Sequence, residues 1–121
     1  MLEPQVLADR YAALWNQPDA QKRRMEIEAL WHAHGSHFVG TRAVHGFDDL
    51  MERVTGSWER TVRNTGNQFR AHRDAQQLQK AVTFHWEMIR PSDQAVLARG
   101  LEFLVLDEAG LILVDYQFNL A

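Results

Sequence analysis

The order of its secondary-structure patterns is the strongest constraint that this sequence places on its fold. Apolar residues recur at helical spacing over 4–16, over 18–34 and from Gly46 to Val62, which predicts three amphipathic helices. Gly35 and the run Asn64-Thr65-Gly66 are expected to end the second and the third helix. Helices followed by strands favour an α+β domain whose helices cover one face of a twisted antiparallel sheet.

The second half of the chain predicts a meander of four strands. These strands are expected over 68–73, 78–90, 95–106 and 111–120, where alternating apolar residues are bounded by turn-forming residues. Residues 36–40 and 43–45 predict two short strands in addition. The chain has 121 residues and no linker or repeat, so we expect one domain over 1–121.

Composition and charge exclude several classes of partner and site. The net charge is −3 and the thirteen Lys and Arg are scattered, which argues against nucleic-acid binding. Cysteine is absent, which excludes disulfides, thiolate metal sites and a cysteine nucleophile. No dinucleotide or phosphate-binding motif appears, so no cofactor is expected. With neither a signal peptide nor an apolar run of the roughly 18 residues that span a bilayer, we expect a cytoplasmic protein that binds no membrane.

The last two strands are apolar on both faces. Leu101, Phe103 and Val105 point to one side of the sheet, whereas Leu104 and Leu106 point to the other. Because helices can cover only one of these faces, the other predicts a homodimer that forms through the outer face of the sheet.

Several motifs resemble those of the nuclear transport factor 2-like superfamily, in its SnoaL-like and ketosteroid isomerase-like branch. The stretch from Arg10 to Asp19 resembles the first-helix signature of that branch. Phe84-His85-Trp86, Gly100-Leu101-Glu102-Phe103 and 106–112 resemble its last strands. The resemblance implies a cone-shaped fold, with three N-terminal helices packed on a curved, mainly antiparallel sheet around one pocket. It leaves the reaction open, because the superfamily includes isomerases, cyclases, dehydratases, hydrolases and non-catalytic carriers.

The resemblance also assigns roles to individual residues. Tyr11 occupies the position of the isomerases' oxyanion-hole tyrosine, and Glu102 that of their protonated acidic partner. Their aspartate base corresponds to Val39, which cannot accept a proton. His37 lies two residues earlier, on the same face of the short strand.

The final hairpin predicts a second acidic residue beside Glu102. If the hairpin turns symmetrically about Glu108 and Ala109, Glu102 faces Asp115 and Gly100 faces Gln117. Two carboxylates so placed repel each other and are expected to share one proton near neutral pH. A bulge that shifted the hairpin by one residue would instead turn Asp115 to solvent.

These residues suggest acid–base chemistry on a carbonyl compound. A protonated Glu102 and Tyr11 could donate hydrogen bonds to a developing enolate, as the corresponding acid and tyrosine do in ketosteroid isomerases. His37 is the first candidate for the base and His45 is the second. The alternative is structural: Tyr11 and Glu102 can form a buried hydrogen bond with no catalytic role, and His37 can be a surface or capping histidine.

Aromatic residues are expected to form the walls of the pocket. The predicted wall residues are Trp15, Trp31, Phe69, Phe84 and Trp86, with Val39 and Gln117 beside them, although core packing alone also explains such aromatics. An apolar pocket with a few polar groups is typical of a small-molecule site. His32, His34 and His37 could be read as metal ligands, but alternate helix positions point in different directions, so no metal is expected.

Two main functions remain open at this point. The first is a cofactor-free isomerase, cyclase or dehydratase that acts on a small hydrophobic carbonyl compound. The second is a carrier domain that binds such a molecule without changing it, and a dimerising scaffold is a third possibility.

Overall fold

The computed structural model describes residues 2–121, which form three α-helices, a π-helix and a seven-stranded sheet. The helices are α1 (Pro4–Leu14), α2 (Ala20–Leu30), α3 (Gly46–Ser57) and the π-helix η1 (Trp58–Arg63). The strands are β1 (Trp31–Val39), β2 (Arg42–His45), β3 (Gln68–Ala71), β4 (Gln76–Leu78), β5 (Ala81–Arg90), β6 (Ala95–Leu106) and β7 (Ile112–Leu120).

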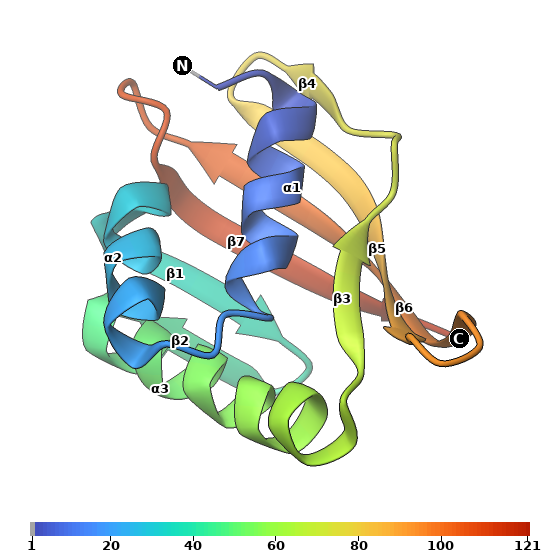
Figure 1. Ribbon diagram of the computed structural model, residues 1–121. Coiled ribbons are helices and arrows are strands. Elements are labelled where there is room, and N and C mark those ends of the chain that lie inside the picture. The colour runs from blue at the N-terminus through green and yellow to red at the C-terminus, as the bar shows by residue number, and fades with distance from the viewer. Residues whose placement is uncertain (1) are drawn as a thin grey trace.

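The sheet is mainly antiparallel and has helices on one side. Its strand order is β2-β1-β7-β6-β5-β3, with β4 paired to β5 as well. Only the pairing of β1 with β7 is parallel among the described strands. Figure 1 shows α1 crossing in front of the curved sheet, with α2 and α3 beside β1 and β2. The predicted α+β class is confirmed.

Local sequence signals explain where the helices begin. Pro4 lies in the first turn of α1, where its missing N–H costs nothing. Asp19 caps α2, because its carboxylate accepts a hydrogen bond from the Lys22 N–H at 2.9 Å. No helix among residues 2–121 combines the length and the apolarity that a membrane span requires.

The prediction that the second helix runs to Gly35 was wrong. The helix ends at Leu30, and Trp31 already pairs with Ile112 as the first residue of β1. Trp31 and His34 therefore belong to a strand rather than to a helix face. Strand pairing with β7 and β2 determines this segment, because tertiary contacts override a short helical pattern.

The strand predictions of the second half held with small changes of boundary. The strand over 95–106 is β6 as predicted, and the predicted short pieces at 36–40 and 43–45 lie, apart from Gly40, in β1 and β2, which pair as a hairpin. The segment over 78–90 is divided, because the chain reverses at Gln79, whose φ of 55° lies in the left-handed region. Only its first residue, Leu78, lies in β4, and the rest from Ala81 onward forms β5.

A pronounced bulge in β1 sets the register of the site. Trp31 pairs with Ile112, yet Ser36 pairs with Val114, so β1 has several more residues than β7 between these points. Gly35 lies inside the bulge, where a Cβ atom would come within 2.8 Å of the Ile112 carbonyl oxygen and of Trp31. Beyond it His37 pairs with Asp115.

The register of the last hairpin differs from the prediction. Glu102 pairs with Gln117, Gly100 with Asn119 and Leu104 with Asp115, and the register shifts once between Val105 and Leu106. The two acids are therefore diagonal rather than directly opposed. The total slip is two residues, and a slip of two leaves every side chain on its original face. Asp115 consequently still points inward and is fully buried.

We predict that Gly35→Ala lowers the free energy of unfolding by about 1–3 kcal/mol, because the added methyl group overlaps backbone that cannot move freely. Urea denaturation followed by circular dichroism measures this. Gly56→Ala is the control, since its Cβ would meet only the flexible end of Arg60, at 3.1 Å, and alanine favours helix. Equal effects of the two substitutions would contradict the role given to the bulge.

Candidate active site

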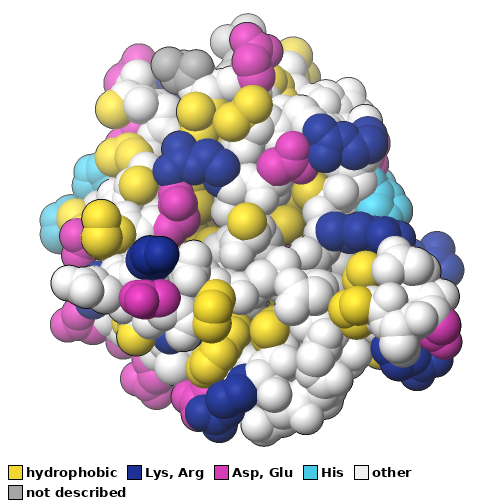
Figure 2. All heavy atoms as spheres, viewed as in Figure 1, with side chains coloured by type: hydrophobic (Ala, Val, Ile, Leu, Met, Phe, Trp, Pro, Cys, Tyr) yellow, Lys and Arg dark blue, Asp and Glu magenta, His cyan; other side chains and the backbone are white. Residues whose placement is uncertain are grey.

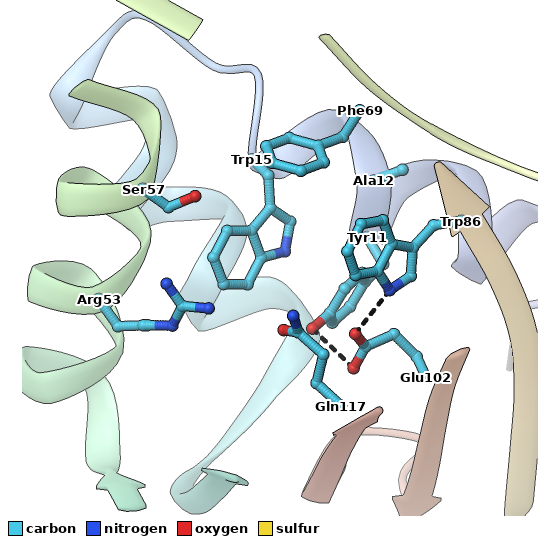
Figure 3. A pocket seen from close by; sticks show the side chains of 9 residues that line it. All are labelled: Tyr11, Ala12, Trp15, Arg53, Ser57, Phe69, Trp86, Glu102 and Gln117. Atoms are coloured by element: carbon cyan, nitrogen blue, oxygen red, sulfur yellow. Dashed lines mark hydrogen bonds between the residues drawn. The ribbon is translucent and has the colours of Figure 1, made fainter. Parts of the chain in front are cut away.

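A cavity opens between α1, α3 and the concave face of the sheet. It has about 340 Å³ of empty volume, including solvent at its mouth. Figure 3 shows its lining side chains, which are Tyr11, Ala12, Trp15, Arg53, Ser57, Phe69, Trp86, Glu102 and Gln117. Aromatic rings and a few polar groups make up the wall, as is usual in small-molecule sites.

The polar side of the cavity is a hydrogen-bonded network of buried residues. The Tyr11 hydroxyl lies 2.5 Å from Asp115 Oδ2 and 3.1 Å from Glu102 Oε2. His37 Nδ1 lies 2.8 Å from the same Asp115 oxygen. Tyr11 comes from α1, whereas the other three come from β6, β7 and β1, so the network joins the first helix to three adjacent strands.

Trp86 fixes the orientation of the Glu102 carboxyl group. Its indole Nε1–H donates to Glu102 Oε1 at 2.9 Å. The indole lies over Gly100, its partner in the neighbouring strand, where a Cβ atom would come within 2.1 Å of the ring. Trp86 can occupy this position only because residue 100 has no side chain.

The environment favours the protonated forms of Tyr11 and Glu102. Burial raises the pKa of Tyr11 well above its usual value, and the nearby charges of Asp115 and Glu102 raise it further. Burial also raises the pKa of Glu102, followed by the charge of Asp115 and a hydrogen bond between the two carboxyl groups. A neutral carboxyl group at Glu102 can therefore act as a donor.

Asp115 is the member of the network that carries negative charge. Burial alone would raise its pKa, but His37 and hydrogen bonds from Glu102, His37 and Tyr11 outweigh burial and lower the pKa. One proton thus stays on Glu102 while Asp115 is ionised. This division agrees with the predicted sharing of one proton, although the two carboxyl groups are not directly opposed.

The structure brings together most, but not all, of the predicted pocket residues. Tyr11, Glu102, Trp15, Phe69, Trp86 and Gln117 line the cavity. Asp115 and His37 are fully buried and belong to the network, but they are not among the lining residues. The alternative that His37 is a surface or capping histidine is therefore wrong.

Four predicted positions lie elsewhere. Trp31 and Phe84 are buried in the core and reach the site only by packing on the Tyr11 ring, each at 5.5 Å between centroids. Val39 lines a separate surface hollow. His45 is exposed on β2 and is hydrogen-bonded to Ser36. Because it lies outside the cavity, it cannot be the second base. His45 is exposed because its side chain projects from the face of β2 that points away from the cavity.

The sequence analysis missed Arg53, which lines the cavity, and Asn16, which holds the lining residue Phe69 in place. Arg53 of α3 stacks on Trp15, with its guanidinium carbon 5.0 Å from the ring centroid. The Asn16 side chain donates to the Phe69 carbonyl and accepts from the Phe69 N–H, both at 2.8 Å, which holds β3 against α1. Helical spacing from Leu50, Val54 and Ser57 could have placed Arg53 near the inner face of its helix. No local signal marks Asn16.

His37, Glu102 and Asp115 could also be considered as metal ligands. One ligand atom of each lies within 4.8 Å of the others. However, Asp115 Oδ2 is already shared by Tyr11 and His37, and a protonated Glu102 is a poor ligand. The arrangement is therefore best described as a hydrogen-bonded network.

Comparison with known proteins identifies the fold through structure alone. No protein-family model matches the sequence, and no curated protein matches it. A solved structure from Agrobacterium tumefaciens, assigned as an isomerase of the SnoaL-like family, has a TM-score of 0.88 with 20% identity over 100% of both chains.

This is the nuclear transport factor 2-like fold. A protein of unknown function with this fold from Exiguobacterium has a TM-score of 0.70 and 16% identity, over 93% of this chain and 97% of its own. A Sinorhizobium meliloti protein assigned as a polyketide cyclase has a TM-score of 0.66 and 5% identity, over 96% and 99% of the two chains. The nuclear transport factor 2-like fold predicted from the motifs is thus confirmed.

We predict that Glu102→Gln makes stability less sensitive to pH. Because the folded-state pKa of Glu102 lies above its unfolded value, the folded state holds the extra proton once the pH exceeds the unfolded value. The free energy of unfolding then falls as pH rises, by about 1.4 kcal/mol per pH unit while the two states differ by one proton. Glutamine stays neutral and removes this fall.

Urea denaturation between about pH 5 and pH 8 measures the difference in slope. Glu108→Gln, in the exposed turn before β7, is the matched control and should behave like the wild type. Parallel pH profiles for wild type and Glu102→Gln would show that Glu102 ionises normally in the fold.

Proposed function

We propose that this protein is a cofactor-independent acid–base enzyme that acts on a small, largely apolar carbonyl compound. One observation carries the proposal: Tyr11 and Glu102 are hydrogen-bonded to each other at the wall of an aromatic cavity, where burial favours the protonated form of both. Isomerisation, aldol-type cyclisation and dehydration all require stabilisation of a negative charge that develops on a carbonyl oxygen.

The cavity wall also offers donors that have no protein acceptor among residues 2–121. Trp15 Nε1 and Arg53 Nε are buried and have no hydrogen-bond partner there. Figure 3 shows the Trp15 nitrogen facing the space beside Tyr11. Unsatisfied buried donors are costly, and a ligand that carries an oxygen acceptor would satisfy them.

In the proposed step, the substrate oxygen accepts hydrogen bonds from Glu102 and from Tyr11, whose hydroxyl proton turns from Asp115 to the substrate, while a proton leaves the adjacent carbon. Among the titratable lining residues Tyr11, Glu102 and Arg53, none is suited to accept that proton. We therefore assign the proton to water at the mouth of the cavity, and water returns a proton to the same or another carbon. Before a ligand binds, the Asp115 carboxylate accepts hydrogen bonds from Tyr11 and His37 and so holds both side chains in position.

Two of the similar structures support the choice of an enzyme. They are assigned as an isomerase and as a polyketide cyclase. Both assignments concern those proteins, and at 20% and 5% identity they support the reaction class here only as a proposal.

A carrier function is the second candidate. It is favoured by the lack of a base among the lining residues and by the short contact that commits the Tyr11 proton to Asp115. A cavity of this kind could hold a carbonyl compound without changing it.

Hydrogen–deuterium exchange at the carbon next to a carbonyl distinguishes the two functions. We expect the wild type to accelerate exchange of 2-tetralone in deuterated buffer, measured by proton NMR. Tyr11→Phe should slow the catalysed exchange by about 10²–10³-fold, because it removes one donor to the developing oxyanion.

The protein contains only two tyrosines, so Tyr116→Phe on the outer face is the matched control and should retain activity. Glu102→Gln should lower the rate less than Tyr11→Phe, since an amide still donates a hydrogen bond. Binding of 2-tetralone without any accelerated exchange would support the carrier and exclude this enzymatic step.

We also propose that two copies of the chain associate through the outer face of the sheet. Phe103, Tyr116 and Phe118 are 36%, 42% and 53% exposed there, and Phe38 stacks on Tyr116 at 5.6 Å between centroids. Figure 2 views the opposite, helix-covered side, where hydrophobic side chains form small groups among charged ones. A row of exposed aromatic residues on adjacent strands favours a protein contact.

We expect light scattering coupled to size-exclusion chromatography to give twice the mass of one chain for the wild type. Phe103→Glu should give a single chain, because a charge cannot be buried there without a partner. Leu78→Glu, at an exposed apolar position on β4, is the control and should remain dimeric. A monomeric wild type at micromolar concentration would refute the dimer.

A further inference from the structure

Three arginines lie together beside the cavity. Arg42 begins β2, Arg53 lies on α3, and Arg60 lies on η1. All three line two neighbouring surface hollows, and Arg53 also lines the cavity itself. The guanidinium of Arg53 therefore forms a boundary between the aromatic interior and the surface.

These arginines have no anionic partner within residues 2–121. Arg10, Arg24, Arg63, Arg70, Arg73 and Arg90 all form ion pairs with acidic side chains. Among the described residues, none forms an ion pair or side-chain hydrogen bond with Arg42, Arg53 or Arg60. Asp49 and Glu52 line one of the two hollows, and Asp49 accepts a hydrogen bond from the His45 N–H.

The position of Arg53 makes its lack of an anionic partner significant. Burial lowers its pKa, and the nearby positive charge of Arg42 lowers it further. Its Nε atom is buried and has no hydrogen-bond partner in the described chain. A partly buried guanidinium beside two like charges is unfavourable in isolation, and a bound oxyanion would relieve both the repulsion and the unsatisfied donor.

The charge of Arg53 and the shape of the cavity together indicate which kind of ligand would fit. Figure 3 shows Arg53 projecting from α3 toward Trp15, on the other side of the cavity from Glu102. An anion near Arg53 would thus place an attached apolar body among Trp15, Phe69 and Trp86. A guanidinium presents paired donors that match the two oxygens of a carboxylate.

We propose that the ligand carries an anionic oxygen group, such as a carboxylate, which Arg53 binds with help from Arg42 and Arg60 while the apolar body fills the cavity. The inference rests on the proposed function only in taking the cavity as the ligand site. It narrows the substrate class to apolar acids whose carbonyl group lies away from the anion.

The test compares 2-naphthoate with 2-naphthamide, which share a ring system and differ in charge. Isothermal titration calorimetry should show the wild type binding 2-naphthoate at least about tenfold more tightly than the amide, because hydrogen bonds to charged groups are the stronger ones. Arg53→Gln should remove this preference, because it weakens binding of 2-naphthoate by a larger factor than binding of the amide. Added sodium chloride should weaken binding of the anion only.

Arg99→Gln is the control for loss of one positive charge. Arg99 is exposed, and the alternation of β6 places it on the opposite face from Gly100, so its substitution should not affect either ligand. If circular dichroism shows that Arg53→Gln does not fold, the double substitution Arg42→Gln and Arg60→Gln takes its place and should reduce the preference for the anion.

Equal affinities for the two compounds, or an unchanged preference in the arginine variants, would overturn the anion site. Failure of both compounds to bind would overturn it too. Neither result decides the proposed enzymatic function, because exchange of 2-tetralone is measured without any anionic ligand.

Discussion

The buried carboxylate of Asp115 is the group around which the rest of the site is arranged. A charge with no access to water is tolerated only where donors surround it, and here Tyr11 and His37 converge on one of its oxygens. Burial, and then the negative charge of Asp115, raise the pKa of the neighbouring Glu102 and favour its neutral form. Residues of α1, β1 and β6 all interact with Asp115 of β7. The same interactions therefore contribute both to the stability of the fold and to the protonation state of the site.

The chain order and the periodicity of the sequence predicted the architecture well, because both depend on local spacing. Alternation along β6 fixed which side chains face inward, and it placed Glu102 correctly whatever the register. Registers were less predictable. The bulge at Gly35 and the two-residue slip of the last hairpin depend on contacts between distant strands, and no local pattern records them. Because the slip is an even number of residues, Asp115 remains on the inner face of the sheet.

The site was predictable to the extent that its residues resemble known motifs. Tyr11 and Glu102 were found this way, and their meeting is a hydrogen bond in the structure. Arg53 was not found, because an arginine on an amphipathic helix normally projects into solvent. Its role emerges only when α3 packs beside Trp15. The placement of His45 was wrong for a related reason, since the facing of a four-residue strand cannot be read from its composition.

The contact between Trp86 and Gly100 has a consequence for how this fold acquires new specificities. The indole forms part of the cavity wall, whereas Gly100 beneath it does not. A methyl group at position 100 would displace the ring from its present position and disturb its hydrogen bond to Glu102. A single substitution at a residue that does not line the cavity can thus change both the shape of the cavity and the ionisation of Glu102. New specificities can therefore arise in this fold without a change in any cavity-lining residue.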